Sequence, residues 1–411
     1  MAITQFTTTP LGTEQNNFSN RMDTRILEQQ TFVTEANALA TEMNLYATFG
    51  AGAALALNGF KNKIIGGDFH TNPWQLGISF AAVNNGVYTA DRWIYGKVGA
   101  AVHTISKAAD SPSAVQAGIY SGFCLGLAVT TAQTTFAAGD NFTIGQKIEG
   151  INSASFGFGQ AGSRFITKSF WVKAAKTGIH CVSFKNSALT RSYVAEYTIT
   201  AANTWELKKI TVPVDTSGTW LYDTGTGLTA TFALAAGTTF QTTANTWQTG
   251  NFLTTANQVN ELDTIGNNFK INLVQIEPGS IFTAFESQAA SSVRAFCKRY
   301  YRKSYDANTD PGTATNNGAV SARRTITGEA ATIFIETFEE NMRATPSVVW
   351  YNPSTGASGS IYNATTAGTI TVTGENANSP TSTRKIGAPT HASGATAGDI
   401  IIGHYTASAE L

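Results

Sequence analysis

Apolar and polar residues alternate in short runs between residues 62 and 287, and each run is bounded by Gly, Asn, Thr or Ser. In one run Ile166, Lys168, Phe170 and Val172 alternate with a second set of side chains, so one face of a strand can be buried. Many short strands separated by turn signals, without alternating helices, predict a β-sandwich or β-barrel and not a parallel α/β fold. The clearest predicted strands cover residues 164–174, 180–186, 192–200, 206–214 and 269–277.

Residues 291–411 carry the same alternation and form a second predicted β unit. Polar stretches rich in Gly, Asn, Ser and Thr, such as residues 373–398, separate its strands and are expected to be loops. The predicted strands of this unit cover residues 331–338, 347–352, 368–374 and 398–407.

The N-terminal part differs, because residues 14–48 contain neither Gly nor Pro and follow a helical period. Apolar residues recur there at steps of three and four, with polar breaks at Arg25 and Gln29. Such a stripe must be buried, either against the chain's own domain or in a short parallel bundle of several copies, for which we expect a homotrimer. The candidate oligomerisation residues are Phe18, Met22, Phe32, Ala36, Leu39, Met43 and Tyr46.

These patterns predict a mainly β chain in three parts. Residues 1–60 are expected to form an N-terminal helical anchor and oligomerisation segment with a linker. Residues 61–290 are expected to form the central sandwich, and residues 291–411 a C-terminal β domain.

The charge and cysteine content argue against several classes of partner. Only 13% of the residues are charged, and 27 Lys and Arg balance 27 Asp and Glu, whereas a broad polyphosphate binder carries a basic excess. No apolar run approaches the roughly 20 residues that a membrane span needs, and the N-terminus lacks the pattern of a secretory signal. Three widely spaced cysteines without a CxxC pair are expected to be buried thiols of a protein made in a reducing cytoplasm. We therefore expect no nucleic acid partner and no membrane insertion.

Residues 298–303, KRYYRK, pack four cations around two tyrosines and are the strongest local signal for a nucleic-acid groove. The run lies between a small-residue helical segment and the turn-like residues 306–312, and no second basic patch extends it. We interpret it as a connector between two domains, with the tyrosines packed in the junction and the cations facing water or carboxylates.

Motifs for catalysis and for cofactors are weak. Residues 157–162 (GFGQAG) match GxGxxG, but a dinucleotide site needs a helix after the motif, and here a predicted strand follows. Residues 306–312 imitate a calcium loop, yet Pro311 and Asn317 stand where an EF-hand needs Gly and Glu. The five histidines lack HExxH spacing, and no GxSxG is present. We expect no enzyme and no required cofactor.

Several motifs, beginning with KIIGGDFHTNPWQLG (63–77) and YTADRWIY (88–95), together resemble the modules of bacteriophage tail-fibre and receptor-binding virion proteins. The N-terminal FVTEANALATEMN (32–44) is similar to the anchor helix of such proteins. The resemblance implies a jelly roll like that of carbohydrate-binding modules in the middle of the chain, and an N-terminus that attaches to a tail or capsid protein. The other motifs are SFWVKAAKTGIHCVSFKN (169–186), NTWELKKITVPVDTSGTW (203–220), NTWQTGNFLTTANQVNELDTIGNNFKI (245–271), VQIEPGSIFTAFE (274–286), FCKRYYRKSY (296–305) and GHYTASAEL (403–411).

The function that this resemblance implies is a non-enzymatic tail or head fibre or spike, made in the host cytoplasm, that attaches the virion to host surface glycans through several copies. Two alternatives stay open: a structural spacer or adaptor that binds no glycan, and a hydrolase of host polysaccharide. Related jelly-roll modules hold a structural calcium near the first strand, for which Asp68 and Asp91 are the candidate ligands. The other interpretation of Asp68 is that it caps a turn.

Aromatic residues are the glycan candidates, because flat ring faces bind pyranose rings and polar side chains bind their hydroxyl groups. Residues 219–227 look like an exposed loop with three candidates, and the C-terminal domain offers a competing site. Packing in the core is the alternative for the tryptophans. We expect Trp220→Ala to weaken host adsorption without unfolding the protein. The candidates are Trp220, Tyr222, Asp223, Trp247, Tyr351 and Tyr362.

Overall fold

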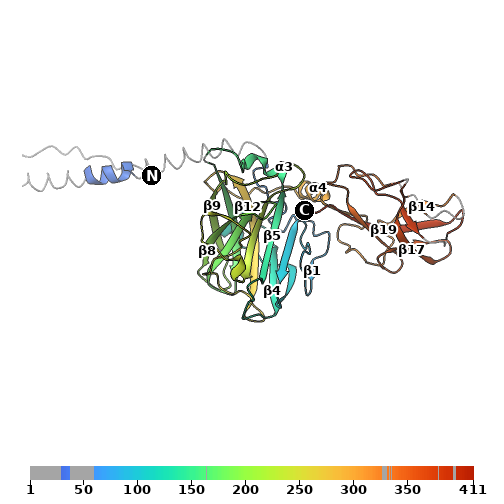
Figure 1. Cartoon of the computed structure of the whole chain (residues 1–411), viewed down its shortest axis with the longest axis horizontal. Helices are drawn as coiled ribbons and strands as arrows, with labels where there is room; N and C mark the ends of the chain where they lie inside the picture. Colours follow the sequence, from blue (N-terminus) through green and yellow to red (C-terminus); the bar gives the residue numbers. More distant parts are fainter. Residues whose placement is uncertain are drawn as a thin grey trace, which may run out of the picture. The chain divides into compact units, whose positions relative to one another are not determined.

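The chain forms two compact units, Met1–Lys61 and Asn62–Leu411 (Figure 1). In the first unit the structure describes a helix over residues 29–37, in which the Phe32 side chain is 41% exposed and Ala36 is half-buried. The other five candidate oligomerisation residues lie outside the described residues, so the bundle stays a prediction; they are Phe18, Met22, Leu39, Met43 and Tyr46. This computed structural model describes residues 29–37, 60–162, 164–325, 331–332, 334, 336–377, 379–391 and 395–411.

The second unit begins with a sandwich of two six-stranded antiparallel sheets. The first sheet contains β1 (Ser79–Phe80), β3 (Val102–Ala108), β4 (Cys124–Thr131), β12 (Asn268–Pro278), β6 (Phe165–Ala174) and β9 (Glu206–Pro213), in that order. The second contains β11 (Trp247–Thr249), β8 (Arg191–Ile199), β7 (Gly178–Lys185), β10 (Thr226–Ala236), β5 (Asn141–Glu149) and β2 (Trp93–Val98), in that order. The chain crosses between the sheets repeatedly, from β4 to β5 and from β6 to β7, as in jelly rolls. The predicted mainly β fold is confirmed.

The two sheets enclose one apolar core that follows the predicted alternation. Ile166, Phe170 and Val172 of β6 are fully buried, whereas Phe165 at the start of the strand is 39% exposed. Lys168 belongs to the same inward-facing set and is buried with it. The alternation of residues 164–174 therefore specifies which face of β6 meets the other sheet.

The C-terminal part forms a seven-stranded antiparallel sheet around its longest strand, β19 (Ile400–Ser408). Its own core includes Trp350 and Ile401. The predicted strand over residues 331–338 is wrong: among its described residues only Ala331 and Thr337 make isolated bridges, while Phe334 and Phe338 turn into the core. The six strands around β19 are β13 (Tyr301–Lys303), β14 (Val320–Arg323), β15 (Ser347–Tyr351), β16 (Ser360–Asn363), β17 (Gly368–Glu375) and β18 (Pro389–His391).

The helices that the structure describes in this unit are short, and no helix of the described ranges is long and apolar enough to cross a membrane. The longest is α4 (Ala290–Lys298), which leads from the sandwich into β13. The others are α2 (Ala114–Ala117), α3 (Gly150–Ser153) and the 3₁₀ turns η2 (Ala154–Phe156) and η3 (Thr238–Phe240).

The three cysteines are buried free thiols, as predicted. Burial raises the pKa of Cys124 to about 12 and that of Cys181 to about 11. Cys297 is fully buried on α4, and burial raises its pKa as well. The reactive thiolate form is therefore suppressed at all three positions.

The KRYYRK run lies where the sandwich meets the C-terminal sheet, which confirms its interpretation as a connector. Tyr300 and Tyr301 are only 1% and 6% exposed. Tyr300 Oη donates a hydrogen bond of 2.6 Å to Glu149 Oε2, at the end of β5. Arg299 donates to both oxygens of Glu149, over 2.9 and 2.6 Å. The Lys303 ammonium donates to three main-chain oxygens, so it bonds within the protein where the two parts meet.

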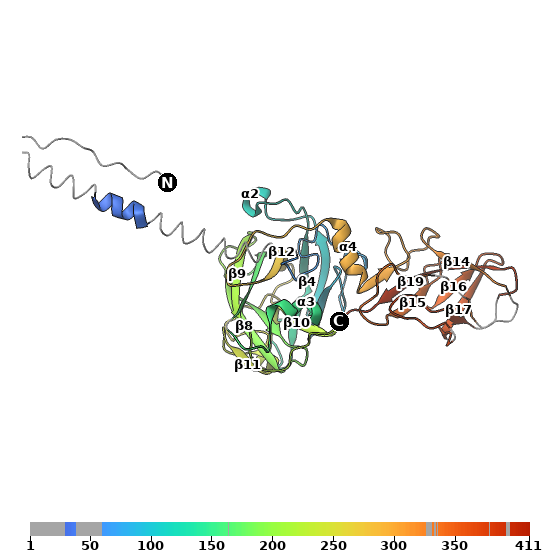
Figure 2. The same ribbon diagram turned by 90° about the horizontal axis from the view of Figure 1, so that it is seen from above.

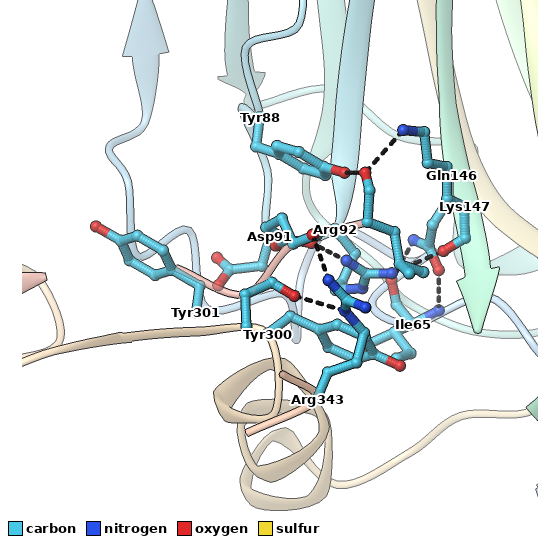
Figure 3. A network of polar contacts seen from close by, with 12 residues as sticks. Ile65, Tyr88, Asp91, Arg92, Gln146, Lys147, Tyr300, Tyr301 and Arg343 are labelled. Carbon is cyan, nitrogen blue, oxygen red and sulfur yellow. Dashed lines mark hydrogen bonds and ion pairs between the residues drawn. The ribbon is translucent and has the colours of Figure 1, made fainter. Parts of the chain in front are cut away.

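A buried arginine forms the centre of this junction. Arg92 is 1% exposed, pairs with the carboxylate of Glu410 and donates a 2.7 Å hydrogen bond to Lys147 O (Figure 3). Its guanidinium carbon also lies 3.5 Å from the centre of the Tyr300 ring. Burial lowers the pKa of Arg92. An unpaired charge at this depth would be strongly destabilising, so the Glu410 carboxylate is needed for the packing of the two parts.

The segment after β19, residues 409–411, is fixed by side chains from elsewhere in the chain. Arg343 donates to Ala409 O and Glu410 O over 2.7 and 2.9 Å. Tyr88 Oη and Lys147 Nζ, both from the sandwich, donate to Leu411 O over 2.5 and 2.7 Å. We call this whole set of contacts the junction; it comprises Tyr88, Arg92, Lys147, Glu149, Arg299, Tyr300, Arg343 and residues 409–411.

Candidate functional site

Three of the aromatic candidates converge at one corner of the sandwich around Phe158. The rings of Phe158 and Trp220 stack, with centroids 4.2 Å apart and an interplanar angle of 21°. Trp247 stands edge-on to both, 5.8 Å from Phe158 and 5.5 Å from Trp220. Tyr222 Oη donates a hydrogen bond to Phe158 O. We call Phe158, Trp220, Tyr222 and Trp247 the aromatic corner.

The GFGQAG stretch builds this corner. Gly159 has a left-handed φ of 72°, and a Cβ atom there would lie 3.2 Å from Trp220 Cδ1. Its N–H donates to Asp215 O over 2.7 Å, which holds the loop against the segment that follows β9. Glycine is therefore required for backbone conformation and for close approach to a ring, and the motif serves packing instead of a dinucleotide.

Hydrogen bonds fix the two tryptophan rings. Trp220 Nε1 donates to Ser217 O over 2.9 Å, and Trp247 Nε1 donates to Pro213 O over 2.7 Å. Trp247 also pairs with Tyr193 across β11 and β8. The rings are thus held in place before any ligand arrives, so that little conformational entropy remains to be lost on binding.

Exposure separates supporting rings from rings that a ligand can touch. Trp220 is only 6% exposed, so the expectation of an exposed indole is wrong, because Phe158 covers one of its faces. Tyr222 is 38% exposed and Trp247 is half-buried. Asp223 is exposed, but its Oδ1 accepts the Gly225 N–H over 2.8 Å and stabilises the turn. Tyr222 and Trp247 therefore offer the accessible ring surface, and Trp220 supports them.

Polar groups flank the corner in a fixed arrangement. Arg191 donates two hydrogen bonds to the Asp215 carboxylate, over 2.7 and 3.1 Å, and a third to Thr249 Oγ1 over 3.2 Å. The pair is bidentate, which holds the guanidinium plane in one orientation. The corner thus combines ring surface with a fixed guanidinium and a hydroxyl, a combination that can bind a polyhydroxylated ligand.

The two C-terminal candidates, Tyr351 and Tyr362, lie apart from this corner, and each contacts a different set of residues. Tyr351 of β15 stands edge-on to Tyr305 at 6.0 Å, and Tyr305 stacks on the buried His404 at 3.7 Å. Tyr362 lies on β16 and pairs with Ile402 of β19. The structure does not join these tyrosines into one surface with the aromatic corner, and their role in glycan binding stays a prediction.

Asp68 and Asp91, the candidate calcium ligands, are both engaged by protein donors. Asp68 Oδ1 accepts hydrogen bonds from the Thr71 N–H and Oγ1, over 3.1 and 2.8 Å, and so caps a turn. Asp91 accepts the N–H and the Nε2 of Gln75, both over 2.7 Å. Burial raises the pKa of both carboxyl groups. The hydrogen bonds from Thr71 support the turn interpretation of Asp68. Within the described ranges, no group of three His, Cys, Asp or Glu side chains is arranged to hold a metal ion.

Sequence reasoning missed Phe158, Arg191 and Asp215. The glycines around Phe158 could have indicated a tight loop that packs on a ring. Arg191 and Asp215 lie in separate strand and loop segments, so their pairing depends on how β8 and the segment after β9 meet in space. Nothing in their local sequence signals it.

No protein-family model matches the chain, and no curated protein matches it. Among solved structures, the enzymatically active domain of tailspike protein 4 from bacteriophage CBA120 is 13% identical, over 53% of this chain and 22% of that one, with a TM-score of 0.29. A family 11 carbohydrate-binding module from Clostridium thermocellum, solved with a β-1,3-1,4-mixed-linked tetrasaccharide, is 10% identical over 50% of this chain and 99% of its own, with a TM-score of 0.25. The module TmCBM61, solved with β-1,4-galactotriose, is 10% identical over 52% and 97%, with a TM-score of 0.26. Likenesses this distant carry no argument about what this chain binds.

Proposed function

We propose that this protein is a non-enzymatic phage fibre or spike that attaches the virion to the host surface by binding glycans. The observation that carries the glycan half of the proposal is the aromatic corner, where Tyr222 and Trp247 are accessible on a rigid support. The virion half rests on the sequence resemblance to tail-fibre and receptor-binding proteins.

The corner suits a sugar better than it suits a purely apolar ligand. The C–H face of a pyranose ring can stack on an aromatic ring, while its hydroxyl groups need donors and acceptors close by. Arg191 and Thr249 supply such groups beside Trp247, and Tyr222 adds a second ring. A single contact of this kind is weak, so attachment would depend on several copies acting together.

Oligomerisation and virion attachment belong to the N-terminal segment in this proposal. A homotrimer held by the stripe of residues 18–46 would present three corners at once, and the same segment would attach to a tail or capsid protein. Multiplying weak contacts in this way raises the effective affinity without adding any contact to the single chain.

The test is a glycan array probed with the full-length protein and three variants. Trp247→Ala and Tyr222→Ala are expected to reduce glycan retention by about tenfold, from the loss of roughly 1.4 kcal/mol of ring contact. Ile265→Ala is the control, since it removes a 68% exposed apolar side chain outside the corner and should change nothing. Circular dichroism of each variant checks that the fold is retained.

Failure on the array would point to the alternatives. If the wild-type protein binds no glycan but the virion still needs it for assembly, the function is that of a spacer or adaptor and not host attachment. If the protein shortens a purified host polysaccharide, its function is hydrolysis and not attachment. Retention that is equal in wild type, Trp247→Ala and Tyr222→Ala would leave glycan binding but remove the corner as its site.

A further inference from the structure

A second group of rings lies on different loops of the sandwich, around Tyr120. The Tyr120 side chain is 71% exposed. Residue 120 lies in the loop that leads to β4 from α2, the short helix seen at the outer edge of the sandwich in Figure 2. Its ring stands edge-on to the exposed His70, 6.0 Å away, and His70 stacks on Phe123 at 5.8 Å. Lys107 Nζ lies 4.5 Å from the centre of the Phe123 ring. We call His70, Lys107, Tyr120 and Phe123 the rim cluster.

The backbone beneath Tyr120 is fixed, so its exposure is built into the fold. Ser121 is 1% exposed, and its Oγ donates to Asp68 O over 2.7 Å, which ties this loop to the loop that carries His70. The fully buried Asn272 of β12 donates to Ser121 Oγ over 3.1 Å and to Phe123 O over 3.0 Å. Both rings therefore project from anchored backbone, as binding residues do.

Gly122 shapes the position of the ring. Its φ is 76°, and a Cβ atom there would lie 2.8 Å from Tyr120 Oη. Only glycine lets the tyrosine lie over the chain in this way without strain. A large ring kept on the surface by such an arrangement offers stacking area that the protein itself does not use.

Lys107 supplies a positive charge that is in direct contact with no carboxylate of the described residues. Its side chain is half-buried, and it makes no hydrogen bond or ion pair with any residue in the described part of the chain beyond its contact with the Phe123 ring. Asp68 attracts the ammonium electrostatically, but its Oδ1 already accepts two hydrogen bonds from Thr71. A partly desolvated ammonium with unused donors favours an anionic group from outside the chain.

We infer that the rim cluster is a second glycan subsite, specific for a sugar that carries a carboxylate. The pyranose ring stacks on Tyr120, the edge-on His70 ring borders it, and the carboxylate accepts hydrogen bonds from Lys107 Nζ. The inference rests on the proposed glycan-binding function, and it adds the chemical class of one ligand. It involves other loops than the aromatic corner, because β3 and the loop before β4 supply Lys107, Tyr120 and Phe123.

An acidic sugar fits these residues better than other anions do. Inorganic phosphate would use Lys107 and leave the exposed Tyr120 ring without a partner. A neutral sugar would use the rings and leave the ammonium unpaired. Only a ligand with both an apolar ring face and a negative charge satisfies the whole cluster.

The experiment measures binding of a galacturonate oligosaccharide and of a sialic acid oligosaccharide to the full-length protein by calorimetry at low salt, each beside its carboxyl-reduced form. Tyr120→Ala is expected to weaken binding of one acidic oligosaccharide about 5- to 10-fold through the lost ring contact. Lys107→Gln should weaken the same binding about 3-fold and should not affect the carboxyl-reduced form. The control is Val115→Ala, which truncates a 96% exposed side chain of the neighbouring helix α2 and should bind as wild type.

The outcomes separate this inference from the proposed function. If glycans bind and only Trp247→Ala and Tyr222→Ala reduce binding, the rim cluster is not a subsite and the aromatic corner stands. If Tyr120→Ala weakens the acidic and carboxyl-reduced forms equally while Lys107→Gln weakens neither, the assignment to acidic sugars is overturned. If wild-type protein binds neither acidic oligosaccharide but retains neutral glycans, this inference fails alone; if it binds no glycan at all, both fail.

Discussion

Lys168 should lower the stability of the sandwich that contains it, and Lys168→Met should raise it. The side chain is 1% exposed, and its Nζ has no hydrogen-bond partner among the described residues. It lies 3.6 Å from the centre of the Phe232 ring, with Phe184 and Phe170 at 5.6 and 5.7 Å. A ring contact of this kind is worth about 2 kcal/mol when desolvated. Removing an ammonium from water costs several kcal/mol, so desolvation outweighs the ring contact.

The pH dependence gives the prediction its sign. Burial lowers the pKa of Lys168 well below its ordinary value, so the folded state releases this proton at a pH where the unfolded chain still holds it. Between the folded pKa and the unfolded pKa of about 10.4, the unfolded chain binds one more proton, and stability rises with pH by about 1.4 kcal/mol per unit. This contribution is fully present above the unfolded pKa and is lost as the pH falls toward the folded pKa.

Urea unfolding of wild type and Lys168→Met at pH 7, 8 and 9 measures the effect. Methionine keeps the length of the side chain and removes the unsatisfied polar group, which should add about 1–3 kcal/mol of stability at any pH. The gain at pH 7 should be larger, because the unfolded wild-type chain still holds a proton that the folded state has released. The advantage of the variant should shrink by about 1.4 kcal/mol for each pH unit while Lys168 is neutral in the folded state.

Lys209→Met is the matched control, because Lys209 also lies over a ring, 3.4 Å from the centre of Phe282, but is exposed. Its stability should change by less than about 0.5 kcal/mol at each pH. A constant difference between wild type and Lys168→Met from pH 7 to 9 would refute the reasoning. So would a variant that is less stable than wild type at pH 7.

Three further predictions concern other parts of the chain. Trp220→Ala should destabilise the fold by about 3–5 kcal/mol in urea unfolding, since it removes a buried ring stacked on Phe158; a loss of adsorption at unchanged stability would contradict this. Glu410→Gln should cost about 3–5 kcal/mol because Arg92 stays buried without a charge partner, whereas the exposed Glu339→Gln should cost under about 1 kcal/mol; equal effects would show that the buried pair is not special. Deleting residues 1–48 should leave a folded β protein that no longer trimerises or attaches to the virion; light scattering that shows an unchanged trimer would rule out the helical bundle.

Local sequence patterns predicted the strands well where alternation was strong. In residues 164–174 the alternation identified both the strand and its inward-facing set, including Lys168. It failed over residues 331–338, where an apolar run became isolated bridges because its phenylalanines pack into a core that other strands enclose. A strand needs an unoccupied neighbouring edge as well as a suitable pattern, and the sequence does not show which edges are occupied.

The candidate site could be predicted only in part, for a related reason. The sequence indicated Trp220, Tyr222 and Trp247 one by one, from the flatness of their rings and from their polar neighbours. It could not show that Phe158 brings them together, or that Phe158 buries Trp220 and leaves Tyr222 accessible. Tyr120 gave no signal at all, because a single tyrosine in a loop has no period, and its exposure depends on anchoring contacts from distant strands.

The junction has a mechanical consequence. A pulling or bending force on the C-terminal sheet passes into the sandwich through Arg92, Arg343, Tyr88 and Lys147 together with the covalent connection at α4. These contacts bear the load in parallel, so all of them must break before the C-terminal sheet can bend relative to the sandwich. Torque applied to the C-terminal sheet is therefore transmitted to the sandwich. Asn62–Leu411 would therefore respond to such a force as one unit.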